Sequence, residues 1–146
     1  MEKAEIITHL SKMLNSYQVY VHKSRYFSWN VIGQDHFELK QRFLTCHEKG
    51  SDHMNRIAAR LGLFNYSVTD NWQTILKTSE IQETTGKLTG FEMVKSIVGD
   101  LLILLSIQTD CVKKANELDD YGTEFLIRHL ISELEKEYLD FICWLK

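Results

Sequence analysis

The chain has 146 residues, of which 44% are hydrophobic and 25% charged, so it is long enough for one domain with its own core and too apolar for a disordered chain. The formal net charge is −3 and the sequence pI is about 6.1, which excludes the overall positive charge typical of nucleic-acid-binding proteins. The chain contains no proline, the strongest helix breaker, so very long helices are permitted.

The N-terminus lacks the apolar stretch and cleavage pattern of a signal peptide. The apolar run at residues 97–105 is too short to span a bilayer and is interrupted by Asp100. The three cysteines are far apart and odd in number, which favours reduced thiols over a disulfide framework or a zinc site. We therefore expect a single domain over residues 1–146, located in the cytoplasm, with no membrane partner.

Residues 2–32 are predicted to form the first helix, because apolar or small side chains recur every three or four residues along one stripe. The residues expected to face inward are Ile6, Leu10, Met13, Leu14, Tyr17, Val21 and Ser24. Gly33 has the position of a left-handed residue that ends a helix, and Asp35 with Glu38 has the spacing of a capping box that opens the next one. The second helix is predicted over about residues 36–61, closed by Gly62. Its inward stripe is expected to comprise Phe37, Leu44, His47, Met54, Ala58 and Leu61, with Phe43 and Ile57 widening it.

Residues 63–88 form a long connection, in which residues 70–76 are predicted to be a short capped helix. Thr89 and Glu92 have capping-box spacing at the start of the third helix, which runs to about residue 118. After a polar break at residues 119–122, the fourth helix is expected to use Phe125 and later apolar residues up to Leu145. The connections are thus short, long and short, which predicts an all-α, ferritin-like four-helix bundle with one long crossover carrying a short helix between helices 2 and 3.

Three short segments carry a family resemblance. They are Ser28-Trp29-Asn30-Val31-x-Gly33, Phe37-Glu38-Leu39 and Ile57-Ala58-x-Arg60, and together they resemble the front half of a Dps-type miniferritin. Gly122-Thr-Glu and the run at residues 131–135 also fit, more loosely. This resemblance implies a shell-forming protein of iron and oxidative-stress physiology, whose identical subunits assemble into a hollow dodecamer.

The resemblance also implies a ferroxidase centre between two subunits, built from two histidines, two aspartates and a glutamate. At the corresponding positions this chain has Ser28, Lys40, Leu44, Asn55 and Ala59. Leucine and alanine cannot bind iron, serine and asparagine are poor ligands, and the lysine ammonium repels a cation. We therefore expect no metal at these positions, no catalytic residue and no tightly bound cofactor. Our hypothesis is that Lys40 replaces the metal and bonds to Asn55 across the dimer.

Two other groups of polar residues are candidate sites. His47, Glu48, Asp52 and His53 could form an alternative metal cluster, although a solvated helix face is the simpler interpretation and His47 is better explained as a core histidine. Asp119, Asp120 and Glu124 are explained by helix capping, while the resemblance implies that this region lines a pore through which ferrous ions enter.

The sequence therefore favours a Dps-like shell that stores or sequesters iron as cargo without an intact ferroxidase centre. Two alternatives stay open: a structural or DNA-associating shell without iron chemistry, and a ferroxidase that uses substitute ligands such as His47 or Asp52. Mixed assembly with an intact paralogue also stays open. The acidic pI and the lack of a lysine-rich tail argue against tight DNA binding and leave only weak, multivalent association.

Overall fold

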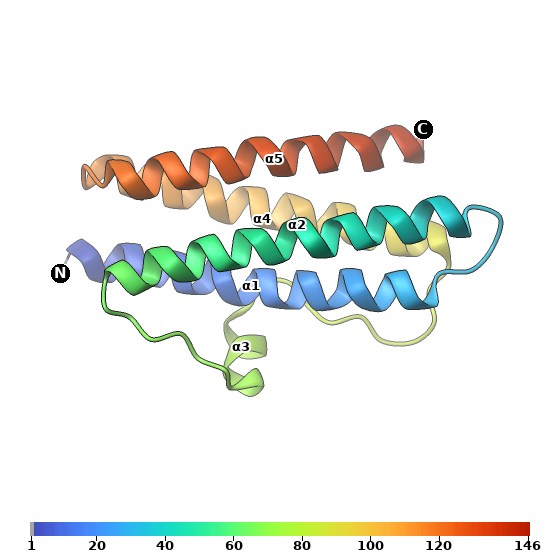
Figure 1. Ribbon diagram of the computed structural model, residues 1–146, viewed down its shortest axis with the longest axis horizontal. Coiled ribbons are helices and arrows are strands. Elements are labelled where there is room, and N and C mark those ends of the chain that lie inside the picture. The colour runs from blue at the N-terminus through green and yellow to red at the C-terminus, as the bar shows by residue number, and fades with distance from the viewer. Residues whose placement is uncertain (1) are drawn as a thin grey trace.

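The computed structural model describes residues 2–146, and its described part contains five helices (Figure 1). They are α1 (Glu2–Asn30), α2 (His36–Leu63), α3 (Trp72–Thr78), α4 (Gly90–Glu117) and α5 (Tyr121–Leu145). No helix in residues 2–146 is long and apolar enough to cross a membrane.

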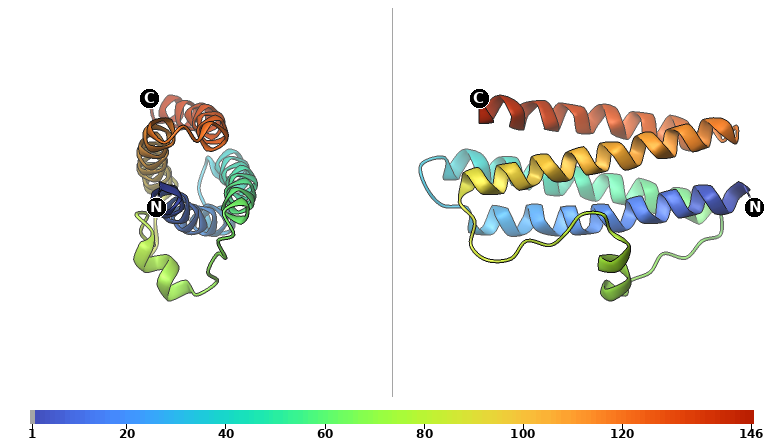
Figure 2. Two further views of the ribbon diagram at one scale, coloured as in Figure 1. Left: turned by 90° about the vertical axis from the view of Figure 1, so that its left-hand side faces the viewer. Right: turned by 180° about the vertical axis from the view of Figure 1, so that it is seen from behind.

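The four long helices form a bundle of two hairpins, α1 with α2 and α4 with α5 (Figure 1, Figure 2). The crossover between α2 and α4 returns the chain to the end of the bundle where α2 began, so α2 and α4 run in the same direction. The short helix α3 lies within this crossover and packs against α1, outside the four-helix core. The predicted all-α, ferritin-like fold with one long crossover is confirmed.

The core follows the whole predicted stripe on α1 but only part of the predicted stripe on α2, where Phe43, Ile57 and Leu61 are buried and Met54 and Ala58 are partly buried against the core. All seven apolar or small residues expected to face inward on α1 are buried: Ile6, Leu10, Met13, Leu14, Tyr17, Val21 and Ser24. On α2 the buried residues are Leu39, Phe43, Cys46, Gly50, His53, Ile57 and Leu61. The helical period therefore places Phe37 on the opposite face, where it is 80% exposed, and the prediction that it packs in the core was wrong. Phe125 of α5 was misassigned for the same reason and is 77% exposed.

The helix ends match some of the predicted caps. The Thr89 and Glu92 capping box forms at the start of α4, with both side chain to backbone bonds present. Asp35 precedes α2, but its side chain makes no capping bond, so the second predicted capping box was wrong. The short helix is capped by Asn71, and α2 continues through Gly62 to Leu63, before Asn65 adopts a φ of 58°.

A buried ion pair joins α1 to α4. Lys23 Nζ lies 2.7 Å from Asp100 Oδ2, and both side chains are less than a tenth exposed. Burial raises the pKa of Asp100 to about 6, while the ammonium of Lys23 partly opposes this effect. Asp100 thus interrupts the apolar pattern of α4 because it has a partner on another helix.

We predict that Lys23→Met lowers the free energy of unfolding by about 3–5 kcal/mol at pH 7, because it leaves a buried carboxylate without its cation. The loss should shrink as the pH falls from 7 towards 5, since Asp100 can then be buried in its neutral form. Urea unfolding at both pH values, at a fixed protein concentration, measures this. The double variant Lys23→Met/Asp100→Leu is the control and should be close to the unmodified chain in stability. A single variant as stable as the double variant at pH 7 would contradict the prediction.

Candidate functional site

Three of the five positions that correspond to ferroxidase ligands lie where the end of α1 meets the start of α2. Ser28 is 1% exposed, and its hydroxyl donates to the Arg25 carbonyl oxygen at 2.6 Å. Lys40 is half-buried, and its Nζ donates to the Ser28 carbonyl oxygen at 3.2 Å. This carbonyl is one of the last in α1 and has no partner within the helix, so Lys40 caps α1. Leu44 lies one turn further along α2 and is half-buried.

The other two positions, Asn55 and Ala59, are exposed further along α2. At about 1.5 Å per residue, Asn55 lies roughly 16 Å beyond Leu44 along the helix axis. Within one chain the five positions therefore form two separate groups that cannot share an ion. The predicted contact between Lys40 and Asn55 needs a second copy of the chain, and within one chain Lys40 binds the α1 carbonyl instead of pointing into bulk water.

The four residues of the candidate alternative metal cluster lie on different sides of α2. His47 is half-buried, with Nδ1 3.2 Å from the Val21 carbonyl oxygen, whereas His53 is 1% exposed and faces the bundle interior. Glu48 and Asp52 are exposed on the outer side. Across residues 2–146, no group of three or more histidine, cysteine, aspartate or glutamate side chains is arranged to hold a metal ion.

A buried polar network at the centre of the bundle was not predicted. The Tyr17 hydroxyl lies 2.9 Å from His53 Nδ1, and Gln108 Nε2 donates to the same hydroxyl at 2.7 Å. These residues come from α1, α2 and α4, and all three are buried. His53 Nε2 has no hydrogen-bond partner and lies 3.7 Å from Glu133 Oε1 of α5. The only signal in the sequence was a polar residue, Gln108, at an inward position of α4.

This network is electrically neutral at neutral pH. Burial raises the pKa of Tyr17 well above its ordinary value, so the phenol stays protonated. Burial lowers the pKa of His53, and the nearby Glu133 carboxylate opposes this effect only in part. Arg56 also faces the histidine and lowers its pKa further. His53 therefore serves as a neutral hydrogen-bonding group in the core.

We predict that His53 contributes a loss of stability as the pH falls below about 6.5, the ordinary pKa of histidine, because the unfolded chain then binds a proton that buried His53 does not. The raised pKa of Asp100 contributes a change of the opposite sign over the same pH range, so the contribution of His53 is measured as a difference between variants. His53→Gln should flatten this dependence between pH 7 and pH 5. Urea unfolding midpoints at the two pH values give the comparison. His22→Gln, at an exposed position of α1, is the matched control and should keep the pH dependence of the unmodified chain. Equal slopes in all three proteins would contradict the prediction.

Charged side chains join α2 to α5 through ion pairs that were not predicted from the sequence either. Arg42 and Lys49 of α2 bind Glu137 of α5 at 3.0 and 2.8 Å, although Glu137 is only 2% exposed. Arg42 also binds Asp140 at 2.7 Å, and Arg56 binds Glu133 at 3.2 Å. Basic residues of one helix thus neutralise the acidic residues of the other.

The acidic residues of the candidate pore lining lie at the start of α5. Asp120 is the N-cap of α5, accepting from the Thr123 backbone N–H, and it binds Arg60 at 2.9 Å. Partial burial would raise the pKa of Asp120, but the bonds from Thr123 and Arg60 outweigh it and hold the pKa below its ordinary value. Glu124 binds Arg128 at 2.9 Å, and Asp119 accepts from the Tyr121 hydroxyl at 3.1 Å. Two of the three carboxylates therefore already have a cationic partner.

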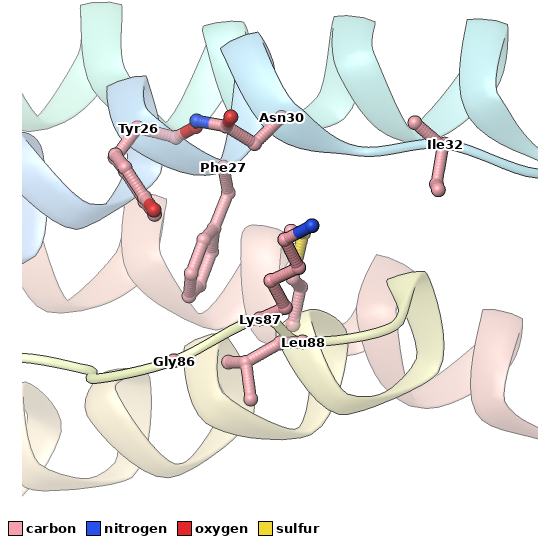
Figure 3. A pocket seen from close by; sticks show the side chains of 8 residues that line it. Tyr26, Phe27, Asn30, Ile32, Gly86, Lys87 and Leu88 are labelled. Atoms are coloured by element: carbon pink, nitrogen blue, oxygen red, sulfur yellow. The ribbon is translucent and has the colours of Figure 1, made fainter.

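A cavity of about 280 Å³ lies between the end of α1, the crossover and α4 (Figure 3). Phe27 points from α1 towards the crossover, and Lys87 of the crossover extends its ammonium group towards the turn after α1. The lining contains no carboxylate, histidine or thiol: it consists of Tyr26, Phe27, Asn30, Ile32, Gly86, Lys87, Leu88 and Met93. The cavity therefore has neither the ligands of a metal site nor a nucleophile with a base.

Comparisons with known proteins agree with this architecture. Residues 5–142 match the family model described as a ferritin-like domain. A "DNA protection during starvation protein" of Brevibacillus brevis is 28% identical over 127 residues, covering 87% of this chain and 85% of that protein. An uncharacterized protein of Haemophilus influenzae is 26% identical over 136 residues, covering 93% of this chain and 85% of that protein.

Among solved structures, a Dps protein from Vibrio cholerae O1 superimposes with a TM-score of 0.95 at 28% identity, covering 99% of this chain and 91% of that one. A Dps protein from Bacillus brevis superimposes with a TM-score of 0.95 at 26% identity, covering 99% and 97%. The family model spans nearly the whole chain, and the sequence relatives and the superimposed structures agree with it. The chain therefore belongs to the ferritin-like family, and within that family it is a Dps-type miniferritin.

Proposed function

We propose that the chain assembles into a hollow dodecameric shell that stores or sequesters iron without an intact intersubunit ferroxidase centre. The relatives support a role in stress physiology, since they include the DNA protection during starvation protein of Brevibacillus brevis and general stress protein 20U of Bacillus subtilis. The absence of an intact ferroxidase centre is supported by one observation: the side chains at the five corresponding positions are poor iron ligands or cannot bind iron. These positions are Ser28, Lys40, Leu44, Asn55 and Ala59.

Lys40 is the strongest argument against iron at these positions. Its ammonium group is fixed on the Ser28 carbonyl oxygen at 3.2 Å. Like unit charges about 4 Å apart near a protein surface repel by about 4 kcal/mol, and a divalent ion doubles this repulsion. The Ser28 hydroxyl is already bonded to a backbone carbonyl, and Leu44 has no donor atom. Iron bound here would thus meet a positive charge without the carboxylates that it needs.

Exposed apolar side chains support the assembly. Near the turn between α1 and α2, Trp29, Ile32 and Phe37 are 64%, 80% and 80% exposed. Near the start of α5, at the opposite end of the bundle, Tyr121 and Phe125 are 66% and 77% exposed. Monomeric proteins rarely expose such groups of large apolar residues. Two groups at opposite ends favour an assembly larger than a dimer, because one twofold contact covers a single patch on each copy.

Iron entry would depend on the start of α5. In a pore formed there, Asp119 would supply the carboxylate that has no cationic partner in its own chain, while Arg60 and Arg128 reduce the charge of Asp120 and Glu124. The cation-attracting field would then be weaker than three free carboxylates would give.

We predict that the unmodified protein, mixed with ferrous iron in air, oxidises it no faster than buffer does, and that iron still co-elutes with a dodecamer-sized particle. The matched variant restores the ligand set with Ser28→His, Lys40→His, Leu44→Asp, Asn55→Asp and Ala59→Glu, and should oxidise iron several-fold faster. Absorbance of ferric iron follows the oxidation, and size separation with an iron assay of each fraction follows the uptake.

Each other outcome corrects a different part of the proposal. Rapid oxidation by the unmodified protein would contradict the absence of a ferroxidase centre, and His47→Ala and Asp52→Ala would then locate substitute ligands. A dodecamer that stays free of iron would contradict storage and leave a shell without iron chemistry. Elution as a monomer or dimer would contradict the shell itself.

A further inference from the structure

A tyrosine and a histidine lie in direct contact at the centre of the bundle, shielded from solvent. Tyr17 is 0% exposed and His53 is 1% exposed, and the phenol oxygen lies 2.9 Å from Nδ1 of the imidazole. Gln108 donates from its side-chain amide to the same phenol oxygen at 2.7 Å. A phenol has a single hydroxyl hydrogen, so the hydroxyl that accepts from Gln108 donates its own hydrogen to His53 Nδ1. His53 is therefore the base in this hydrogen bond.

The far side of the imidazole faces a negative charge. Because Nδ1 accepts, the ring hydrogen of neutral His53 lies on Nε2, which is 3.7 Å from Glu133 Oε1. The same carboxylate oxygen lies 3.2 Å from Arg56 Nη1 and 3.2 Å from Nε2 of the exposed His129. A positive charge formed on His53 therefore has an anion beside it, and this anion also contacts side chains at the surface.

A buried phenol gives up an electron readily only where its proton can move to a neighbouring base. Removal of one electron makes the phenolic proton strongly acidic, and without a base the core would hold an uncompensated positive charge. The electron can tunnel through the packed interior to an oxidant at the surface, whereas the proton crosses only a hydrogen bond. A neutral imidazole within hydrogen-bond distance meets this requirement.

Tyr20, about one turn further along α1, gives an internal comparison. It is 1% exposed, and its ring centre lies 6.2 Å from that of Tyr17. Its hydroxyl faces the thiol of Cys46 instead of an imidazole. Burial raises the pKa of this thiol to about 12, so the thiol stays protonated, and a protonated thiol is a weak hydrogen-bond acceptor. Of these two buried tyrosines, Tyr17 is the one with a base for its proton.

We infer that Tyr17 and His53 form a redox-active pair, in which Tyr17 gives one electron to an oxidising radical and passes its proton to His53. The oxidant is a one-electron acceptor such as the carbonate radical, which is reduced to carbonate. The phenolic O–H bond breaks and an N–H bond forms at His53 Nδ1, so the products are a neutral tyrosyl radical and an imidazolium. A one-electron reductant such as ascorbate reverses the step, because the electron returns to Tyr17 and the proton returns from Nδ1 to the phenol oxygen.

The surroundings of the pair favour a persistent radical. The bundle core shields the ring of Tyr17, so its radical cannot couple with a second tyrosyl radical from solution. The Gln108 amide still donates to the radical oxygen, and the Glu133 carboxylate balances the charge of the imidazolium. The pair requires neither a shell nor iron, so each chain could remove one oxidising radical and then be restored by a reductant.

The test is one-electron photo-oxidation of the full chain in EDTA, which keeps iron out of the reaction. A light flash with tris(bipyridine)ruthenium and persulfate generates the oxidant, and electron paramagnetic resonance of frozen samples records the tyrosyl radicals. Exposed tyrosines such as Tyr26 and Tyr121 also react, but their radicals couple in solution and decay first. The signal that persists after this decay is therefore the quantity to compare.

We expect a persistent tyrosyl signal from the unmodified chain and a several-fold smaller one from Tyr17→Phe and from His53→Gln. Glutamine at position 53 can still accept a hydrogen bond from Tyr17, but it is not a base that can take the proton. Tyr20→Phe is the matched control, because it removes the neighbouring buried phenol that lacks a base, and its signal should equal that of the unmodified chain. Far-ultraviolet circular dichroism checks that each variant is folded.

Each contrary result removes a named part of the inference. An undiminished signal in Tyr17→Phe would show that the radical lies elsewhere, and loss of the signal in Tyr20→Phe would place it on Tyr20. An undiminished signal in His53→Gln would show that the imidazole is not the proton acceptor. The absence of any persistent radical in the unmodified chain would overturn the pair altogether.

A second measurement needs no variant and therefore does not depend on how the variants fold. The unmodified chain is incubated at length in deuterium oxide, photo-oxidised and studied by electron–nuclear double resonance. We expect two exchangeable deuterons hydrogen-bonded to the radical oxygen, one from the His53 imidazolium and one from the Gln108 amide. A radical oxygen without these two deuterons would contradict the pair.

Discussion

Helix α2 has three sides with different surroundings, and the rest of the structure depends on which residues its sequence places on each side. One side packs into the core through residues such as Phe43 and Ile57. A second side meets α5 through basic residues, among them Arg42 and Lys49, which neutralise the buried Glu137. The third side faces outward and carries four of the five positions that the family resemblance aligns with ferroxidase ligands: Lys40, Leu44, Asn55 and Ala59. Because successive residues are about 100° apart around the helix axis, a one-residue insertion would rotate every side chain after it in α2 into a different environment.

The fold was predictable because its signals are local: connection lengths, the capping box at Thr89 and the apolar stripe of α1. The burial of α2 was predicted less well, since Phe37 is large and apolar and was therefore assigned to the core, whereas it is exposed. The buried polar contacts could not be predicted. Lys23 with Asp100, and Tyr17 with Gln108, are paired by the packing of α1 against α4, which no short segment of sequence contains.

The five positions that differ from a ferroxidase centre are separable from the residues that build the bundle. Lys40 satisfies the Ser28 carbonyl at the end of α1, and the Ser28 hydroxyl bonds to the Arg25 carbonyl one turn earlier. Asn55 and Ala59 are exposed on the far half of α2. None of these contacts needs a metal, so the bundle keeps its architecture with different chemistry on its outer face. We therefore propose that iron is the cargo of an assembly and that Lys40 is a structural cation.

The central claim is that iron does not bind between two copies at these positions. Anomalous diffraction at the iron absorption edge, from crystals of the assembled protein soaked aerobically with ferrous iron, tests it most directly. We predict no anomalous peak near Lys40 and an ammonium group still bonded to the Ser28 carbonyl oxygen. A peak between Lys40 of one copy and Asn55 of another, with the lysine side chain displaced, would contradict it.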